Sequence, residues 1–219
     1  MKSVSAKRPL FLLAALALVW FATPAVAQID LDASLQDLRQ RWAVANYEKR
    51  GLPRIAALDT LAQSAVRLTA LHPDRVEVWI WSGIIQATLA SAGTGINSLN
   101  AATAARIDLE RALALDPEAM EGAAYTTLGA LYYKTPGWPV GFGDRKKAEK
   151  LLRLALKISP DAMDSNYFYG DFLLEQGQRR KAREHLLRAQ QAPPHPGDAL
   201  AHAGRQRDIA KLLARIHAQ

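Results

Sequence analysis

The chain has 219 residues, of which 49% are hydrophobic and 22% charged, with a formal net charge of +7 and no cysteine. This composition is typical of a folded globular protein and excludes a disordered, collagen-like or disulfide-stapled chain. The lack of a thiol also excludes a cysteine nucleophile, an iron–sulfur cluster, cysteine-ligated zinc and a lipid-bearing N-terminal cysteine.

The first 27 residues have the three parts of a secretory signal peptide. Lys2, Lys7 and Arg8 precede an apolar run over 10–22, and the small residues Ala-Val-Ala follow at 25–27. A helix of that run would be about 20 Å long, which is shorter than the roughly 30 Å hydrocarbon core of a bilayer. We therefore expect cleavage after residue 27 and a periplasmic protein that is not a lipoprotein and keeps no stable membrane span. An uncleaved anchor is the alternative.

Positive charge is concentrated toward the C-terminus. From residue 178 onward the chain has nine lysines and arginines but only three acidic residues. We interpret this charge as the solvated surface of terminal helices, with a docking face for an acidic partner or an anionic membrane as the alternative. Nucleic acid is not expected as a partner, because an exported protein rarely meets it.

The chain after residue 30 is predicted to be helical throughout, because apolar residues recur every three or four positions without strand-like alternation. The first two helices are expected near 32–48 and 53–71. Pro73, Pro117 and Pro160 each follow a helix end and open the next helix. Proline suits that place because the first helical position leaves its N–H unpaired in any case.

Small residues recur on a common spacing in three units. Each unit ends in a proline with alanines 5 and 12 residues before it and has a glycine further back: Gly83 to Pro117, Gly129 to Pro160, and Gly170 to Pro194. The glycine lies farther from the alanines in the first two units, which predicts insertions at about 91–101 and 134–144. Gly129 also lies two residues farther beyond its preceding proline than the other two glycines do, so the register of that helix stays open.

These positions resemble those of the tetratricopeptide repeat (TPR), a helical hairpin of about 34 residues. Gly170, Ala182, Ala189 and Pro194 match its small-residue and proline positions. Small residues where two helices touch allow their axes to approach closely. The resemblance implies an all-α, right-handed, TPR-like α-solenoid.

The expected domain organisation follows from this resemblance. It consists of a cleaved signal peptide at 1–27, an N-terminal capping hairpin at 28–73, three TPR-like repeats at 74–194 and a C-terminal capping helix at 195–219. We therefore expect about four helical hairpins and one further helix. The end units are atypical because they must cover the apolar faces of the array.

Residues 129–148 resemble a second group of proteins. The segment Gly-Ala-Leu-Tyr-Tyr at 129–133, Pro139 and the segment 143–148 are similar to the helix–loop–helix of the T-components of TRAP transporters. Those are periplasmic repeat proteins that associate with a solute-binding protein. Many of them are lipoproteins, whereas this chain has no cysteine to carry a lipid. The resemblance implies a transporter accessory whose partner is a solute-binding protein.

The insertion at 134–144 is the first candidate contact site. Its prolines and glycines impose turns, and it carries two aromatic residues, Trp138 and Phe142, that a simple connection would not need. Either both rings fold back and plug the solenoid, or the loop is a lid or a partner contact.

The inner groove of the implied solenoid is the second candidate site. By resemblance, the inward positions of the first helices include Ile80, Ile84, Tyr133, Tyr167 and Asp171. Rigid amphipathic tyrosines suit contact with a peptide or an apolar ligand. Ordinary repeat packing in a shifted register is the alternative interpretation.

Signatures of catalysis are missing from the sequence. It contains no G-x-S-x-G, H-E-x-x-H, phosphate-binding-loop or dinucleotide-binding pattern. His185, His195, His202 and His217 never stand three or four residues apart, so one helix cannot present two of them to a metal ion; we interpret them as surface residues. We expect neither enzyme activity nor a cofactor or metal.

Our leading hypothesis is a non-enzymatic periplasmic TPR protein that mediates protein–protein interaction, with a role as a solute-transporter accessory. The alternative is a carrier that encloses a lipid or an organic acid between the inner groove and the Trp138 loop. A closed cavity of roughly several hundred Å3 beneath the loop would favour the carrier. An open groove with exposed Tyr133 and Tyr167 would favour a protein partner.

Overall fold

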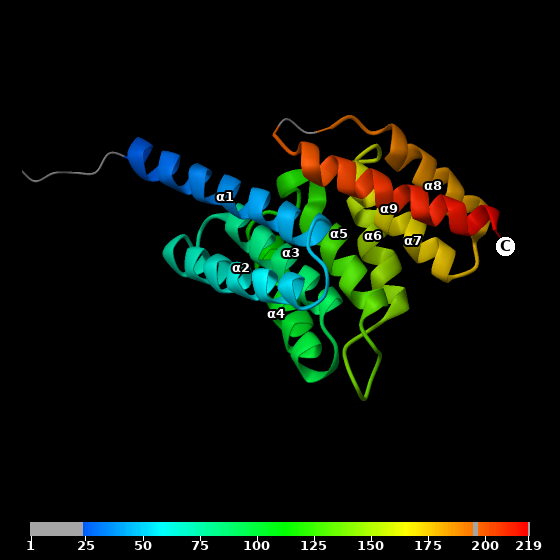
Figure 1. The fold of residues 1–219 in the computed structure, drawn as a ribbon, viewed down its shortest axis with the longest axis horizontal. Helices are drawn as coiled ribbons and strands as arrows, with labels where there is room; N and C mark the ends of the chain where they lie inside the picture. The colour runs from blue at the N-terminus through cyan, green and yellow to red at the C-terminus, as the bar shows by residue number, and fades with distance from the viewer. Residues whose placement is uncertain (1–23, 195–196, 219) are drawn as a thin grey trace, which may run out of the picture.

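The computed structural model describes residues 24–194 and 197–218. The predicted signal peptide lies outside the described residues up to residue 23. The described residues form nine α-helices and no strand (Figure 1). In chain order the helices are α1 (Pro24–Tyr47), α2 (Gly51–Leu71), α3 (Val76–Ala92), α4 (Gly95–Leu115), α5 (Ala119–Lys134), α6 (Arg145–Ile158), α7 (Met163–Glu175), α8 (Arg179–Gln191) and α9 (Ala199–His217).

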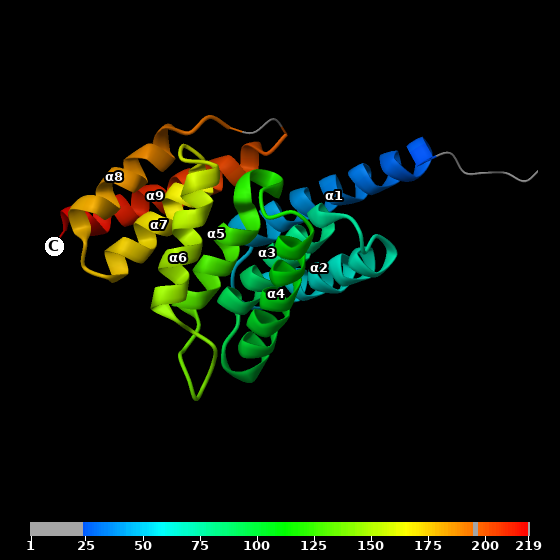
Figure 2. The ribbon, with the colours of Figure 1, turned by 180° about the vertical axis from the view of Figure 1, so that it is seen from behind.

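Consecutive helices pair into four hairpins, α1–α2, α3–α4, α5–α6 and α7–α8, and α9 follows the last of them (Figures 1 and 2). The first helices of the hairpins also pack on one another, α3 on α5 and α5 on α7. This arrangement confirms the predicted all-α, TPR-like solenoid of four hairpins and one further helix. No helix within the described ranges combines the length and apolarity that crossing a membrane requires.

The predicted small-residue spacing marks where two helices of one hairpin touch. The six alanines of that spacing are completely buried. The glycine of each first helix faces a leucine of the second helix. The distance from the Cβ atom that the glycine lacks to the leucine Cγ would be 2.5 Å for Gly83 and Leu109, 2.8 Å for Gly129 and Leu152, and 2.9 Å for Gly170 and Leu186. Any larger residue would push the two helices apart.

The start of α5 takes up the two additional residues of its unit. Met120, Glu121 and Gly122 have φ angles of 49°, 59° and 73°, which is the left-handed region, within an otherwise right-handed helix. This irregular turn lies between Pro117 and Gly129. As a result Gly129 still faces its leucine, as its counterparts do.

The first insertion differs from the expected loop at 91–101. Helix α3 continues to Ala92 and α4 begins at Gly95, so only Gly93 and Thr94 connect them. The additional residues lengthen the two helices to 17 and 21 residues, compared with 13 each in α7 and α8. The alanines that follow residue 100 favour helix strongly enough to extend α4 back to the turn. The second insertion does form a loop, between Lys134 and Arg145.

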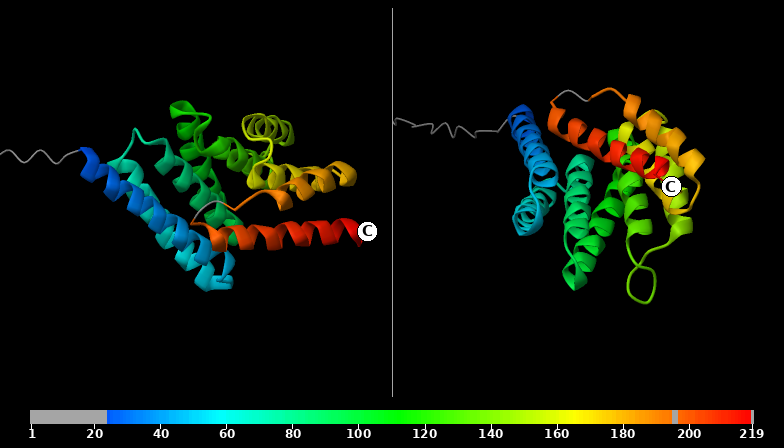
Figure 3. Two further views of the ribbon diagram at one scale, coloured as in Figure 1. Left: turned by 90° about the horizontal axis from the view of Figure 1, so that it is seen from above. Right: turned by 45° about the vertical axis from the view of Figure 1, so that its right-hand side comes forward.

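Helix α9 joins the two ends of the array. It packs on α8, where Ile209 and Leu212 form a hydrophobic cluster with Leu186 and Ala189. The beginning of α9 also contacts α1, as Figure 3 shows. There the ring of Tyr47 lies directly against Gly204. The last helix therefore runs along the inner side of the solenoid and does not only cover its end.

Candidate functional site

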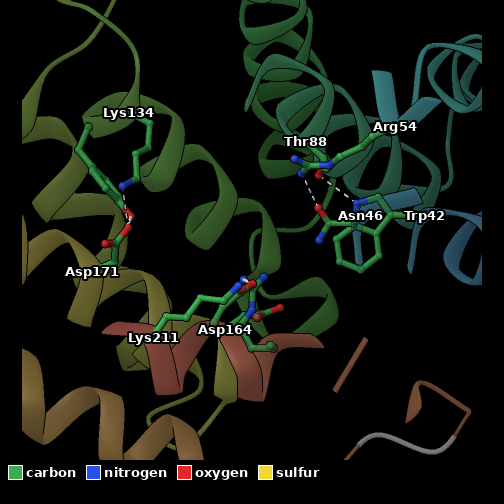
Figure 4. A network of polar contacts seen from close by, with 11 residues as sticks. Trp42, Asn46, Arg54, Thr88, Lys134, Asp164, Asp171 and Lys211 are labelled. Atoms are coloured by element: carbon green, nitrogen blue, oxygen red, sulfur yellow. Dashed lines mark hydrogen bonds and ion pairs between the residues drawn. The ribbon is translucent and has the colours of Figure 1, made fainter. Parts of the chain in front are cut away.

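The inner positions near the N-terminal half are occupied by packing. Ile80 is completely buried in the main hydrophobic core, and Ile84 is half-buried against the same core. Trp42 of α1 donates a hydrogen bond from Nε1 to Thr88 Oγ1 at 2.9 Å (Figure 4). The ring of Trp42 also meets that of Trp81 edge-on. Of the predicted groove residues, Ile80 therefore offers no surface to a ligand in this conformation.

The predicted groove residues Tyr133 and Asp171 are brought together at the inner side of α5 and α7. The Tyr133 hydroxyl donates to Asp171 Oδ2 at 2.9 Å, and Lys134 Nζ lies 2.7 Å from the same oxygen (Figure 4). Glu175 completes the cluster with an oxygen 2.5 Å from Lys134 Nζ. Burial and the neighbouring carboxylate raise the pKa of Tyr133 well above 10. Burial lowers the pKa of Lys134, but the hydrogen bonds that Lys134 donates to Asp171 and Glu175, together with the negative charge of both carboxylates, outweigh it and raise that pKa overall.

This cluster is internally satisfied. Its one buried carboxylate accepts from both the tyrosine and the lysine, so each charge has a partner within the cluster. A paired and hydrogen-bonded carboxylate of this kind links the helices that carry its partners. We assign the cluster to the connection between α5 and α7.

The predicted groove residue Tyr167 is covered by α9. The guanidinium of Arg205 lies 4.3 Å from the ring centre of Tyr167 and 4.9 Å from that of Phe168. Arg205 Nε also donates to Asp164 Oδ1 at 2.6 Å. Burial raises the pKa of both Tyr167 and Tyr47 to about 12. At α7 the predicted groove is thus covered by a helix of the chain itself, and Tyr167 is not presented on an open surface.

Arg205 is the residue that the sequence did not reveal. Its side chain is only 12% exposed although it stands in a helix whose composition is that of a solvated, basic surface. A second contact between distant parts of the chain joins Arg39 of α1 to Asp198, just before α9. The one available signal is Gly204, because a glycine within a helix indicates close approach of another residue.

The Trp138 loop, residues 135–144, projects from the edge of the solenoid where α5 turns into α6 (Figure 1). Its neck is closed by two backbone hydrogen bonds, from Gly143 N–H to the Pro136 carbonyl and from Asp144 N–H to the Tyr132 carbonyl, both 2.9 Å long. A Cβ at Gly143 would lie 2.0 Å from a backbone oxygen, so only glycine fits there. The Asp144 side chain accepts from two backbone N–H groups and caps α6.

The two aromatic rings of this loop point in opposite directions. Phe142 folds back, with its ring edge-on to Tyr132 at 5.4 Å between ring centres and under the guanidinium of Arg106 at 4.7 Å. Trp138, in contrast, is 90% exposed, and Val140 beside it is also exposed. One ring therefore anchors the loop to α4 and α5, and the other is presented to solvent at its tip.

Among the residues that the structure describes, the histidines and the two best-formed hollows add no second candidate site. Within the described ranges no group of three or more histidines and acidic residues is arranged to hold a metal ion, and His195 lies outside those ranges. His185 is not a surface residue as expected, because it is half-buried with Nδ1 2.9 Å from Asn166 Oδ1. A hollow of about 370 Å3 lies at Gly177–Lys181 and one of about 120 Å3 lies between α1 and the start of α9. Neither is beneath the Trp138 loop.

Known proteins resemble this chain in fold. No protein-family model and no curated protein match the chain. Among solved structures it is similar to TTC0263, a thermophilic TPR protein in Thermus thermophilus, with a TM-score of 0.55 at 15% identity over 84% of this chain and 98% of that one. The chain has a TPR-like fold. The chain also aligns with MamA, with a TM-score of 0.45 at 18% identity over 74% of this chain and 88% of that one.

Proposed function

We propose that the chain is a non-enzymatic protein-interaction module of the periplasm whose partner binds the tip of the Trp138 loop. The observation that carries this proposal is the indole of Trp138, which is 90% exposed on a loop with a fixed neck. Tryptophan is one of the side chains that are enriched among the residues that contribute most to binding at protein interfaces. A TPR-like scaffold supports this interpretation because such folds serve protein–protein contact.

The loop is favoured over the inner groove because the predicted groove residues Tyr133, Tyr167 and Asp171 are engaged in contacts within the chain. Tyr133 and Asp171 bond to each other, and Arg205 covers Tyr167. Of the aromatic residues proposed from the sequence, only Trp138 presents its ring. Phe142 contributes indirectly, since its contacts with Tyr132 and Arg106 hold the loop in place.

The partner that we propose is the solute-binding protein of a transporter. This finer assignment is supported by the resemblance of residues 129–148 to the T-components of TRAP transporters, since the Trp138 loop lies within that segment. Periplasmic location is supported by the signal-peptide features of residues 1–27. No observation favours the carrier alternative, because the described hollows do not lie beneath the loop.

The test is affinity capture from periplasmic extract with the exported chain as bait, analysed for proteins and for small molecules. Trp138→Ala is expected to reduce recovery of the partner at least about tenfold, because a buried anchor is worth about 2 kcal/mol or more. Leu52→Ala is the matched control, since Leu52 is an 80% exposed apolar residue on α2. Equal recovery with Trp138→Ala and wild type would exclude the loop as the contact. Recovery of a lipid or an organic acid without a protein would favour the carrier.

A further inference from the structure

The outer faces of α6 and α8 have a strong excess of positive charge. These are the second helices of the last two hairpins, and together they carry eleven lysines and arginines but only two acidic residues, Glu149 and Glu184. All eleven basic side chains belong to exposed residues. In Figure 2, which views the molecule from behind, α6 and α8 both lie on the near side, away from α9.

The charge on α6 is ordered along the helix. Lys146, Lys150, Arg153 and Lys157 follow one another at spacings of four, three and four residues, which places them on one side of a helix. The opposite side of α6 carries its buried residues, Ala148, Leu151, Leu152 and Ala155. The four basic residues therefore form a stripe on the outermost line of the helix.

Most of this stripe is not neutralised within the chain. Arg153 pairs with Glu149 at 2.8 Å, but Lys146, Lys150 and Lys157 have no carboxylate within 4.0 Å among the residues that the structure describes. On α8, Arg188 lies 4.0 Å from the exposed Asp161. Exposed pairs of this kind are weak and leave the positive potential of the face largely intact.

This face lacks what a protein interface needs. Large exposed apolar side chains of the described chain occur on α1, α2, α4, the start of α5 and the Trp138 loop, and none occurs on α6 or α8. Protein interfaces are built on a desolvated apolar or aromatic centre. A lipid surface requires no such centre, because its headgroups are mobile and basic residues attract anionic lipids by charge alone.

We propose that the outer face of α6 and α8 binds the surface of a bilayer that contains anionic lipids. The lysines of the stripe approach the lipid phosphates, and no side chain enters the hydrocarbon region. Helix α6 is about 21 Å long at 1.5 Å per residue, so the stripe spans several headgroups. The face and the Trp138 loop are different surfaces, so this inference does not rest on the proposed function. A chain bound to a membrane through this face can still bind a partner at the tip of the Trp138 loop.

The test uses vesicles of phosphatidylcholine with and without phosphatidylglycerol, and the chain recovered after export, with its N-terminus identified by mass spectrometry. We expect co-sedimentation only with the anionic vesicles, and its loss at high salt, because salt screens exposed charges. The triple variant Lys146→Gln, Lys150→Gln and Lys157→Gln is expected to weaken binding about tenfold or more.

The matched control removes three exposed basic residues from other surfaces, by Lys49→Gln, Arg67→Gln and Arg207→Gln. This control changes net charge equally and is expected to bind nearly as well as wild type. Equal loss in both triple variants would contradict a specific face, and binding to neutral vesicles would contradict the role of charge. Loss of vesicle binding with Trp138→Ala alone would assign the membrane contact to the loop. Failure on vesicles together with stripe-dependent binding of an acidic protein would assign the face to that protein and overturn the proposal.

Discussion

At the scale of single residues, the repeat depends on three glycines that each make room for a leucine. Gly83 shows this most sharply, because the Cβ it lacks would lie 2.5 Å from Cγ and 2.7 Å from Cδ2 of Leu109. Glycine within a helix normally costs about 1 kcal/mol relative to alanine. Gly83 therefore lowers the intrinsic stability of α3 but allows α3 and α4 to cross more closely.

We predict that Gly83→Ala destabilises the protein by about 1–3 kcal/mol, since the added methyl group overpacks the crossing. The free energy of unfolding is measured by urea titration. In the background of Leu109→Ala the same Gly83→Ala change is expected to be neutral or stabilising, because the space is then open. A gain in stability from Gly83→Ala in the otherwise unchanged protein would show that α3 and α4 do not cross this closely.

The second prediction at the scale of single residues concerns His185 and the pH dependence of folding stability. Burial and, to a smaller extent, Arg188 lower the pKa of His185 below its ordinary value of 6.5. The unfolded chain therefore binds a proton at a higher pH than the folded chain does. The contribution of His185 to stability is complete above pH 6.5 and is lost as the pH falls through the lowered folded-state pKa.

The prediction is that His185→Gln reduces the loss of stability on acidification from about pH 7 to about pH 5. It is checked by denaturant titrations of both proteins across that range. The informative quantity is the difference between the two pH curves, since carboxylates common to both proteins cancel. Parallel curves would show that the pKa of His185 is the same in the folded and unfolded states.

At the scale of elements, the hairpins could be predicted from the sequence because their signals are local. The proline joints and the alanine spacing each fall within one repeat, and they correctly placed the helix pairs. The loop expected at 91–101 was wrong because the small-residue spacing gives only the number of additional residues, and helix-favouring residues such as the alanines after residue 100 extend the helices up to a turn at Gly93 and Thr94. The irregular start of α5 could be noticed only as two extra residues before Gly129.

The Trp138 loop shows the same limit for the candidate site. Its composition singled out Trp138 and Phe142, but nothing in the sequence says which ring turns inward. That choice depends on Tyr132 and Arg106, which come from two other helices and enclose Phe142. A loop can therefore be recognised from its residues, whereas the side chain it presents is determined by its neighbours in space.

At the scale of the whole molecule, α9 turns an open array into one whose ends meet. The contacts that do this lie far apart in sequence, as with Arg39 and Asp198 or Tyr47 and Gly204. Such contacts leave no periodic signal, which is why the sequence did not indicate that α9 covers Tyr167. A TPR-like array gains stability from its neighbouring repeats, and an additional contact between first and last elements couples them directly.

We predict that Arg205→Ala loosens this closure and lowers the free energy of unfolding by about 2 kcal/mol, because it removes a charge-assisted hydrogen bond to Asp164 and the cover over Tyr167. Hydrogen exchange is expected to increase in α9 and in the end of α1 around Tyr47, and to change little in α3–α6, which do not contact α9. Arg207→Ala, at an exposed position two residues later, is the control and is expected to have no effect. A uniform increase in hydrogen exchange from α1 to α9 would instead mean that the array unfolds as a single unit and that α9 does not detach from α1 independently of the repeats.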